Sequence, residues 1–232
     1  MNKFTSLLLF LAFNFIIGCK GQSEQEQKFE KKLSTLYDDS EISLASNTVR
    51  NNKGKTSYEF SVMIKKEAGS ISQMVANNMQ SYPAYLFFND TISKTLPYDY
   101  VNVTINVDGV IGNKKYSMRD LEEVTRCRAA ADGFARAIRQ KNHDSLTFYI
   151  DKASNLLPFL LKELDSAEQM KGPVQDFTLD GFTLTHAGNH SMVNYNMTLL
   201  RSGAFQYMQV NVRPVNDKVY NYRLSPVIAG KP

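Results

Sequence analysis

This 232-residue sequence contains no tryptophan and only two cysteines, Cys19 and Cys127. Two cysteines cannot form the dense set of disulfides that stabilises small secreted domains, so that class of fold is excluded. The stability of the chain must come instead from apolar packing. Its hydrophobic fraction of 43% and its length suffice for one or two ordinary cores.

The sequence also lacks a marked excess of charge of either sign. Lysine and arginine total 27 against 23 aspartate and glutamate residues, which gives a net charge of +4 at neutral pH. Domains that bind nucleic acid carry a larger and more concentrated positive charge. We therefore expect no nucleic-acid partner.

Familiar catalytic motifs are missing as well. The sequence has no nucleophile elbow, no Walker loop, no zinc-protease helix motif and no cysteine pair. His186 and His190 flank a short turn and could face each other across a hairpin. Zinc needs further ligands, however, and none has a suitable local spacing, so exposed hairpin ends are the favoured interpretation. The prediction is no catalytic residues, no cofactor-binding residues and no metal ligands.

The N-terminus carries one apolar run, residues 7–17, interrupted only by Asn14. It is too short to span a bilayer, which needs about 20 apolar residues. A positive residue, Lys3, precedes the run, an order typical of a secretory signal. The last two residues of the run and the two after it, Ile16, Ile17, Gly18 and Cys19, resemble the lipobox of bacterial lipoproteins. This resemblance implies cleavage after Gly18 and a fatty acyl group such as palmitate on Cys19.

The lipobox resemblance divides the N-terminal region into a signal peptide, residues 1–18, and a flexible polar tether, residues 19–28. An ordinary cleaved signal with an incidental cysteine is the alternative. Lys20 is not the Asp that holds many such lipoproteins in the inner membrane. The expected location is therefore the Gram-negative outer membrane, on its periplasmic or outer face. A lipid on Cys19 would leave Cys127 without an intramolecular disulfide partner.

Residues 29–116 are predicted to form a small α-β-β-α-β unit. An amphipathic helix is expected over 26–37, followed by strands over 42–49 and 56–64. A second helix follows from about Ser70, where Ser70 and Gln73 have capping-box spacing, and Pro83 is expected to end or restart it. Residues 101–107 alternate apolar and polar side chains and predict the third strand, on a sheet with one wet face.

Residues 117–232 are predicted to form a helix-first unit with a four-stranded antiparallel sheet. A long helix over 118–141 is capped by Ser117, a short helix is capped by Asp144, and a leucine-rich helix spans 153–169. After residue 172 the apolar period changes to two, which predicts strands over 175–185, 191–200, 204–212 and 218–224. Short turn-like connectors favour a meander. The fold class is therefore α+β.

The run of residues 131–153, followed by a leucine-rich helix and four strands, resembles the ketosteroid-isomerase-like superfamily, also called nuclear-transport-factor-two-like. Leu146, Tyr149 and Asp151 match its short helix loosely. The resemblance covers roughly the last half of the chain. It implies a curved sheet wrapped on helices around a cone-shaped cavity. That superfamily contains enzymes, receptors and scaffolds, so the fold alone assigns no function.

Three further features allow more than one interpretation. Asp180 interrupts the alternation of its strand and can mark a β-bulge. Cys127 lies on the apolar stripe of its helix, which favours a buried inert thiol. A basic set on the same helix predicts either an anion-attracting face or a solvated face balanced by acidic residues. This set comprises Arg126, Arg128, Arg136, Arg139 and Lys141.

The sequence therefore predicts a membrane-anchored envelope lipoprotein, held by the lipid on Cys19. We expect a non-enzymatic module that binds a small apolar ligand in the cone or an envelope protein partner. The alternative is a ketosteroid-isomerase-like or hydrolytic enzyme that uses an acidic residue in the cone pocket. Two or more ionisable side chains converging inside the cone would favour the enzyme, whereas an all-apolar or filled cone would favour the module.

Overall fold

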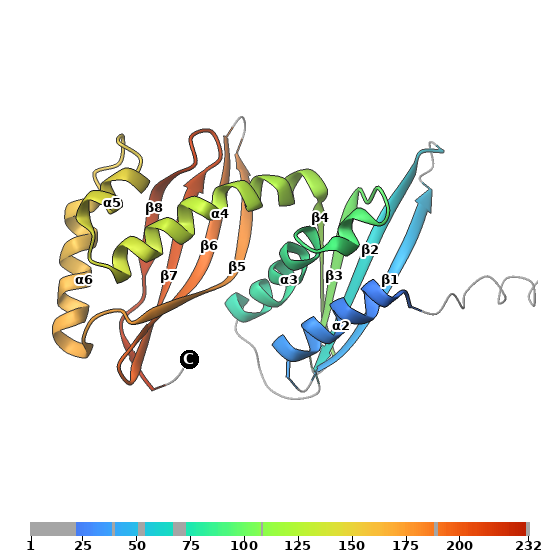
Figure 1. Cartoon of the computed structure of the whole chain (residues 1–232), viewed down its shortest axis with the longest axis horizontal. Coiled ribbons are helices and arrows are strands. Elements are labelled where there is room, and N and C mark those ends of the chain that lie inside the picture. The colour runs from blue at the N-terminus through green and yellow to red at the C-terminus, as the bar shows by residue number, and fades with distance from the viewer. Residues whose placement is uncertain are drawn as a thin grey trace, which may run out of the picture.

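The computed structural model describes residues 22–38, 40–50, 54–66, 73–107, 109–187 and 190–230. Within them the chain forms two β-sheets, of four and five strands, with helices packed on them (Figure 1). The expected α+β class is confirmed. Residues 1–21, which include Cys19 and the apolar run, lie outside the described residues.

The first sheet is built from elements that precede the long central helix. They are α2 (Glu24–Leu36), β1 (Ser40–Arg50), β2 (Thr56–Lys66), α3 (Gln73–Phe88), η1 (Thr91–Lys94), β3 (Tyr100–Val107) and β4 (Val110–Ser117). The strand order is β1-β2-β3-β4. β2 and β3 are parallel, and α3 lies on the connection between them, whereas the other neighbours are antiparallel.

Alternation along β2 decides which face of this sheet is covered. Phe60 and Ile64 are fully buried, whereas Met63 on the opposite face is 48% exposed. Phe29 of α2 and Phe87 of α3 both pack on the Phe60 ring, with centroid separations of 6.1 and 4.2 Å. The two helices therefore cover one face and leave the other wet, as the sequence predicted.

Helix α2 begins at Glu24, two residues before the predicted helix over 26–37, and its first residues lie in the stretch 19–28 that was expected to be a tether. Its start is fixed by a capping box in which Ser23 accepts from the Glu26 backbone N–H and the Glu26 carboxylate accepts from the Ser23 N–H. The reciprocal bonds satisfy N–H groups that the helix itself leaves free. Phe29 and Leu33 then anchor the helix in the core.

Two features of the first unit differ from expectation. Strand β4 was not predicted, and it pairs antiparallel with β3 across a turn in which Gly109 has a φ of +80°. Helix α3 continues through Pro83 to Phe88, because the buried Ala84 and Phe87 hold its second half against the core. The expected cap at Ser70 lies outside the described residues.

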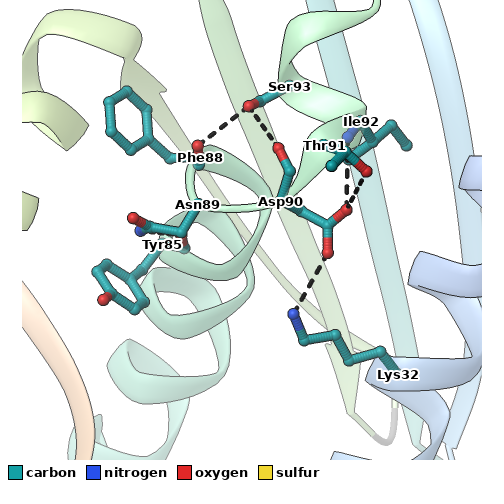
Figure 2. Close-up of polar contacts among 8 residues, drawn as sticks. All are labelled: Lys32, Tyr85, Phe88, Asn89, Asp90, Thr91, Ile92 and Ser93. Carbon is teal, nitrogen blue, oxygen red and sulfur yellow. Dashed lines mark hydrogen bonds and ion pairs between the residues drawn. The ribbon is translucent and has the colours of Figure 1, made fainter.

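Polar side chains tie the end of α3 to α2 (Figure 2). Asp90 caps η1, and its carboxylate accepts from the Ile92 backbone N–H at 3.4 Å and pairs with Lys32 of α2 at 3.3 Å. The Ser93 hydroxyl donates to the Phe88 carbonyl at 3.0 Å. The Ser93 bond satisfies a carbonyl at the α3 C-terminus, where the helix itself has no donors left, and the Asp90 carboxylate links η1 to α2.

The second sheet follows the helices of the second unit. The elements are α4 (Met118–Arg139), α5 (His143–Tyr149), α6 (Leu157–Lys171), β5 (Asp176–Ala187), β6 (His190–Arg201), β7 (Ala204–Arg213), β8 (Lys218–Leu224) and β9 (Ile228–Ala229). β5 to β8 form the expected antiparallel meander. A two-residue strand, β9, adds to β7 and was not predicted.

The caps of the second unit agree with the sequence at α4 and differ at α5. Ser117 accepts from the Asp120 N–H at 3.0 Å and caps α4, as predicted. The cap of α5 is Asn142, whose side-chain oxygen accepts from the Ser145 N–H at 2.9 Å, and the expected Asp144 lies inside the helix. Helix α5 starts at His143, so the capping position directly before it is occupied by Asn142.

The two units are joined without a linker and share one core. Ser117 ends β4 and caps α4, and buried residues of both units belong to a single cluster. Helix α3 also packs on β5, which has a bulge between Leu179 and Gly181. The Ser81 hydroxyl accepts from the Phe182 N–H at 2.9 Å. A Cβ on Gly181 would lie 2.8 Å from a backbone atom of α3, so only glycine fits there.

We expect Ser81→Ala to lower the free energy of unfolding by about 1–3 kcal/mol, because the buried Phe182 N–H would lose its acceptor. Chemical denaturation of the full chain measures this loss, and amide hydrogen exchange should show faster exchange at Phe182. Ser202→Ala, in the exposed turn after β6, is the matched control. Unchanged protection of the Phe182 amide would contradict the prediction.

Candidate functional site

A cavity of about 430 Å³ lies at the end of the second unit where α4 ends, between α5, α6 and the end of β6. Its volume falls within the range of roughly 300–1,000 Å³ that is usual for small-molecule sites. The apolar part of the wall comes from three helices and the segment before β5. It comprises Ile138, Leu146, Leu161, Leu164 and Val174.

Helix α6 forms the outer wall of this cavity and is weakly packed. Only Leu160 and Ala167 of this helix are buried. Phe159 and Met170 are 65% and 64% exposed. A second hollow of about 500 Å³ separates the other side of α6 from β7 and β8. Leu157, Leu161 and Leu164 are only half-buried against the core, so the helix is held by few fully buried side chains and has a hollow on each side.

Five ionisable side chains also line the cavity: Lys141, His143, Asp165, Glu168 and Arg201. Lys141 and Glu168 form an ion pair across the cavity, between the end of α4 and α6. Lys141 has a φ of +53°, a left-handed conformation that ends α4 and turns the chain toward α5. His143 and Asp165 are exposed at the rim.

Arg201 differs from the other four because it is buried, with only 5% of its surface exposed. Its guanidinium donates to the Gly172 carbonyl at 2.6 Å and to the Gln206 side-chain oxygen at 3.2 Å. Its Nε has no hydrogen-bond partner among the described residues. Burial lowers the pKa of the Arg201 guanidinium, because a charged group loses solvation inside the protein.

Sequence reasoning missed Arg201, although the signal was present. The inward face of β6 reads Val193, Tyr195, Met197 and Leu199, all buried. Arg201 is the next residue in that alternation, so its side chain lies on the same inward face. A charged residue in phase with a buried apolar stripe is a strong indication of a functional or paired charge.

Asp180, the acidic residue singled out from the sequence, does not line the cavity. It marks the bulge of β5, as expected, and accepts from the hydroxyls of Thr178 and Thr198 at 2.7 and 2.6 Å. These threonines lie on the sheet face opposite to Met197, because strand side chains alternate. Burial raises the pKa of Asp180, and the two hydroxyls partly offset that rise.

The other residues named from the sequence have structural surroundings. Cys127 is fully buried, and burial together with the nearby Asp217 carboxylate raises the pKa of its thiol to about 12. This is the inert state expected for it. His186 contacts Ser191 through Nδ1 at 3.0 Å, and the side chain of His190 lies outside the described part of the structure. Among the described residues no group of three or more potential ligands could hold a metal ion.

The basic set of α4 is mostly ion-paired. Arg126 pairs with Asp217, Arg128 with Asp132, Arg139 with Asp176 and Lys141 with Glu168. The partners come from several elements. These pairs favour the interpretation of a solvated, balanced face over that of an anion-attracting one.

Comparison with protein-family models, with curated proteins and with solved structures gives no match to this chain. None of the described helices is long and apolar enough to cross a membrane. The cavity and its residues are therefore the basis for any functional assignment.

Asp151 forms a turn and does not reach the cavity. Its carboxylate accepts from the Ala153 N–H at 2.9 Å and from the Asn216 amide at 3.1 Å. These hydrogen bonds, led by the one from Ala153, lower the pKa of Asp151. A carboxyl group whose pKa is lower in the folded than in the unfolded state stabilises the fold above its unfolded pKa. That contribution is lost as pH falls through the folded pKa.

We therefore expect Asp151→Asn to lower the melting temperature at neutral pH, with a difference from the natural chain that shrinks in acid. Thermal unfolding followed by circular dichroism between neutral and acid pH measures this. Asp38→Asn at an exposed position is the control and should show little difference. A constant difference across the pH range would show that the charge of Asp151 is not responsible.

Proposed function

We propose that this chain is a lipid-anchored protein of the bacterial envelope that binds a small, largely apolar ligand without chemical conversion. The anchor would be the acyl group on Cys19, which holds the protein in the outer membrane, facing the periplasm or the surface. The ligand would occupy the cavity between α4, α5, α6 and β6. An envelope protein partner remains a further proposal of the same kind.

The observation that carries the binding proposal is a cavity behind a weakly packed helix, with both apolar and ionisable side chains in its wall. Filled protein interiors have few voids larger than a water molecule. An open cavity of about 430 Å³ whose wall includes leucine, isoleucine and valine side chains has room for a ligand that would cover this apolar surface. The helix-first order and the meander also support the proposed membership of the ketosteroid-isomerase-like superfamily.

The enzymatic alternative is favoured by one observation, the five ionisable side chains that line the cavity. An isomerase of the resembled superfamily uses an acidic base with a tyrosine and a protonated carboxyl group. None of the described residues lining this cavity is a tyrosine. Glu168 is paired with Lys141, and Asp165 is exposed. These surroundings support binding over proton transfer.

The anchor is tested by Cys19→Ala in the native cell. We expect the natural chain in the membrane fraction and the variant released from it, because a bacterial lipid anchor contributes roughly 0.8 kcal/mol per buried methylene. Cys127→Ala is the matched control, since that thiol is buried in the fold. Mass spectrometry of the purified N-terminus should show an acylated Cys19. An unmodified Cys19, or a variant that stays membrane-bound, would refute the anchor.

The cavity is tested with octanol as a neutral probe, titrated by calorimetry into the full chain in lipid nanodiscs, with empty nanodiscs as blank. We expect saturable binding to the natural chain. Leu164→Phe, which fills the cavity, should weaken binding about tenfold or more, because the ring occupies the space of the probe. Met170→Phe, on the other side of α6, is the matched control. Equal binding by all three chains would refute the site.

A further inference from the structure

We propose that the cavity recognises an amphiphile that carries a single carboxylate, with Arg201 as the residue that binds this carboxylate. The inference rests on the proposed binding function and adds the chemical class of the ligand. It requires an anionic head near the end of β6 and an apolar body along the helices. Its support comes from the surroundings of Arg201 and from the polarity of the cavity walls.

Arg201 is a buried cation, and the nearby Glu168 acts on it electrostatically without forming an ion pair with it. Its two described acceptors, the Gly172 carbonyl and the Gln206 amide oxygen, are both neutral. No described carboxylate forms an ion pair with it, since the nearby Glu168 pairs with Lys141. Buried charges in proteins are almost always paired, because an uncompensated charge is costly. An anionic ligand would supply the missing partner.

The guanidinium also retains hydrogen-bonding capacity. Arginine has five N–H donors, and its planar fork matches the two oxygens of a carboxylate. Gly172 and Gln206 use one donor on each terminal nitrogen, and the buried Nε has no partner. Those two contacts hold the group in place at the wall of the cavity. A fixed cation with donors to spare is suited to bind a carboxylate head.

The remaining walls fit an apolar body and limit the charge of the head. Three leucines also line the cavity, and they come from other elements than Arg201: Leu146 from α5, and Leu161 and Leu164 from α6. Asp165, exposed at the rim, repels anions that approach the mouth. Lys141 is paired with Glu168, so Arg201 is the lining cation that an anionic head would meet, and a single such cation favours a monoanion over a phosphate ester or another dianion.

The test compares three eight-carbon probes, octanoate, octanol and octylammonium, titrated into the full chain in nanodiscs. We expect octanoate to bind most tightly. Arg201→Gln should weaken octanoate binding about 10- to 100-fold, as expected for a lost charged hydrogen bond, and leave octanol binding nearly unchanged. Arg201→Lys should retain part of the preference for octanoate. Arg223→Gln, at an exposed position outside the cavity, is the matched control.

Asp165→Asn gives a second readout that does not disturb the buried arginine. Removing the rim carboxylate should raise octanoate affinity about twofold and leave octanol unaffected. If Arg201→Gln fails to fold by circular dichroism, this variant decides the question, and an unchanged octanoate affinity overturns the inference.

The outcomes separate this inference from the proposed function. Equal affinities for octanoate and octanol, or tighter binding of octylammonium, would overturn the carboxylate inference and leave ligand binding intact. Failure of all three probes to bind would overturn both. Preference for octanoate that is lost in Arg201→Gln and not in Arg223→Gln is the expected result.

Discussion

The packing of α4 against the second sheet is the contact on which the rest of the structure depends. Ten residues of this helix are buried, and Tyr195 of β6 donates a hydrogen bond from its hydroxyl to the Val124 carbonyl. Helix α4 follows β4 directly in the chain and so connects the two units. Ile138 in its last turn lines the cavity. Gly133 allows α5 to lie close, because a Cβ there would overlap the ring of Tyr149. The position of the cavity therefore follows from where this helix ends.

Most helices and strands follow from the spacing of apolar residues in the sequence. The elements that differ from this prediction do so for identifiable reasons. The meander was predicted almost residue by residue because its inward stripe alternates over the whole length of β6. Strand β4 was missed although Asp108 and Gly109 form the dipeptide most typical of a tight hairpin turn. Its sequence, VIGNKKYS, does not alternate apolar and polar residues, so it lacks the period of two that marks the other strands. Pro83 was given too much weight, because tertiary packing of Ala84 and Phe87 outweighs the one hydrogen bond that proline removes.

The candidate site could be predicted from the sequence less well than the fold could. Its walls come from residues 138 to 201, and no local motif records that α4, α6 and β6 end near one another. Gly181 is a similar case, since its need for glycine comes from α3, about a hundred residues earlier in the chain. The ion pair between Lys141 and Glu168 likewise joins helices whose separation the sequence leaves open. Only Arg201 left a local signal, as a charge in phase with an apolar stripe.

The placement of that charge explains why the cavity is not filled by the protein itself. Met208 of β7 pairs with Met197 and is buried on the inward face, but Arg201 on the same face of β6 needs polar partners, and Gly172 and Gln206 supply them. Pushing α6 inward would bring leucines against the guanidinium and remove the space for any counter-ion, at the cost of a buried unpaired charge. With α6 in its observed position, space for a counter-ion remains beside the guanidinium, and there is a hollow on each side of the helix. A ligand with an anionic head and an apolar body satisfies both surfaces at once, which neither water nor a leucine side chain can do.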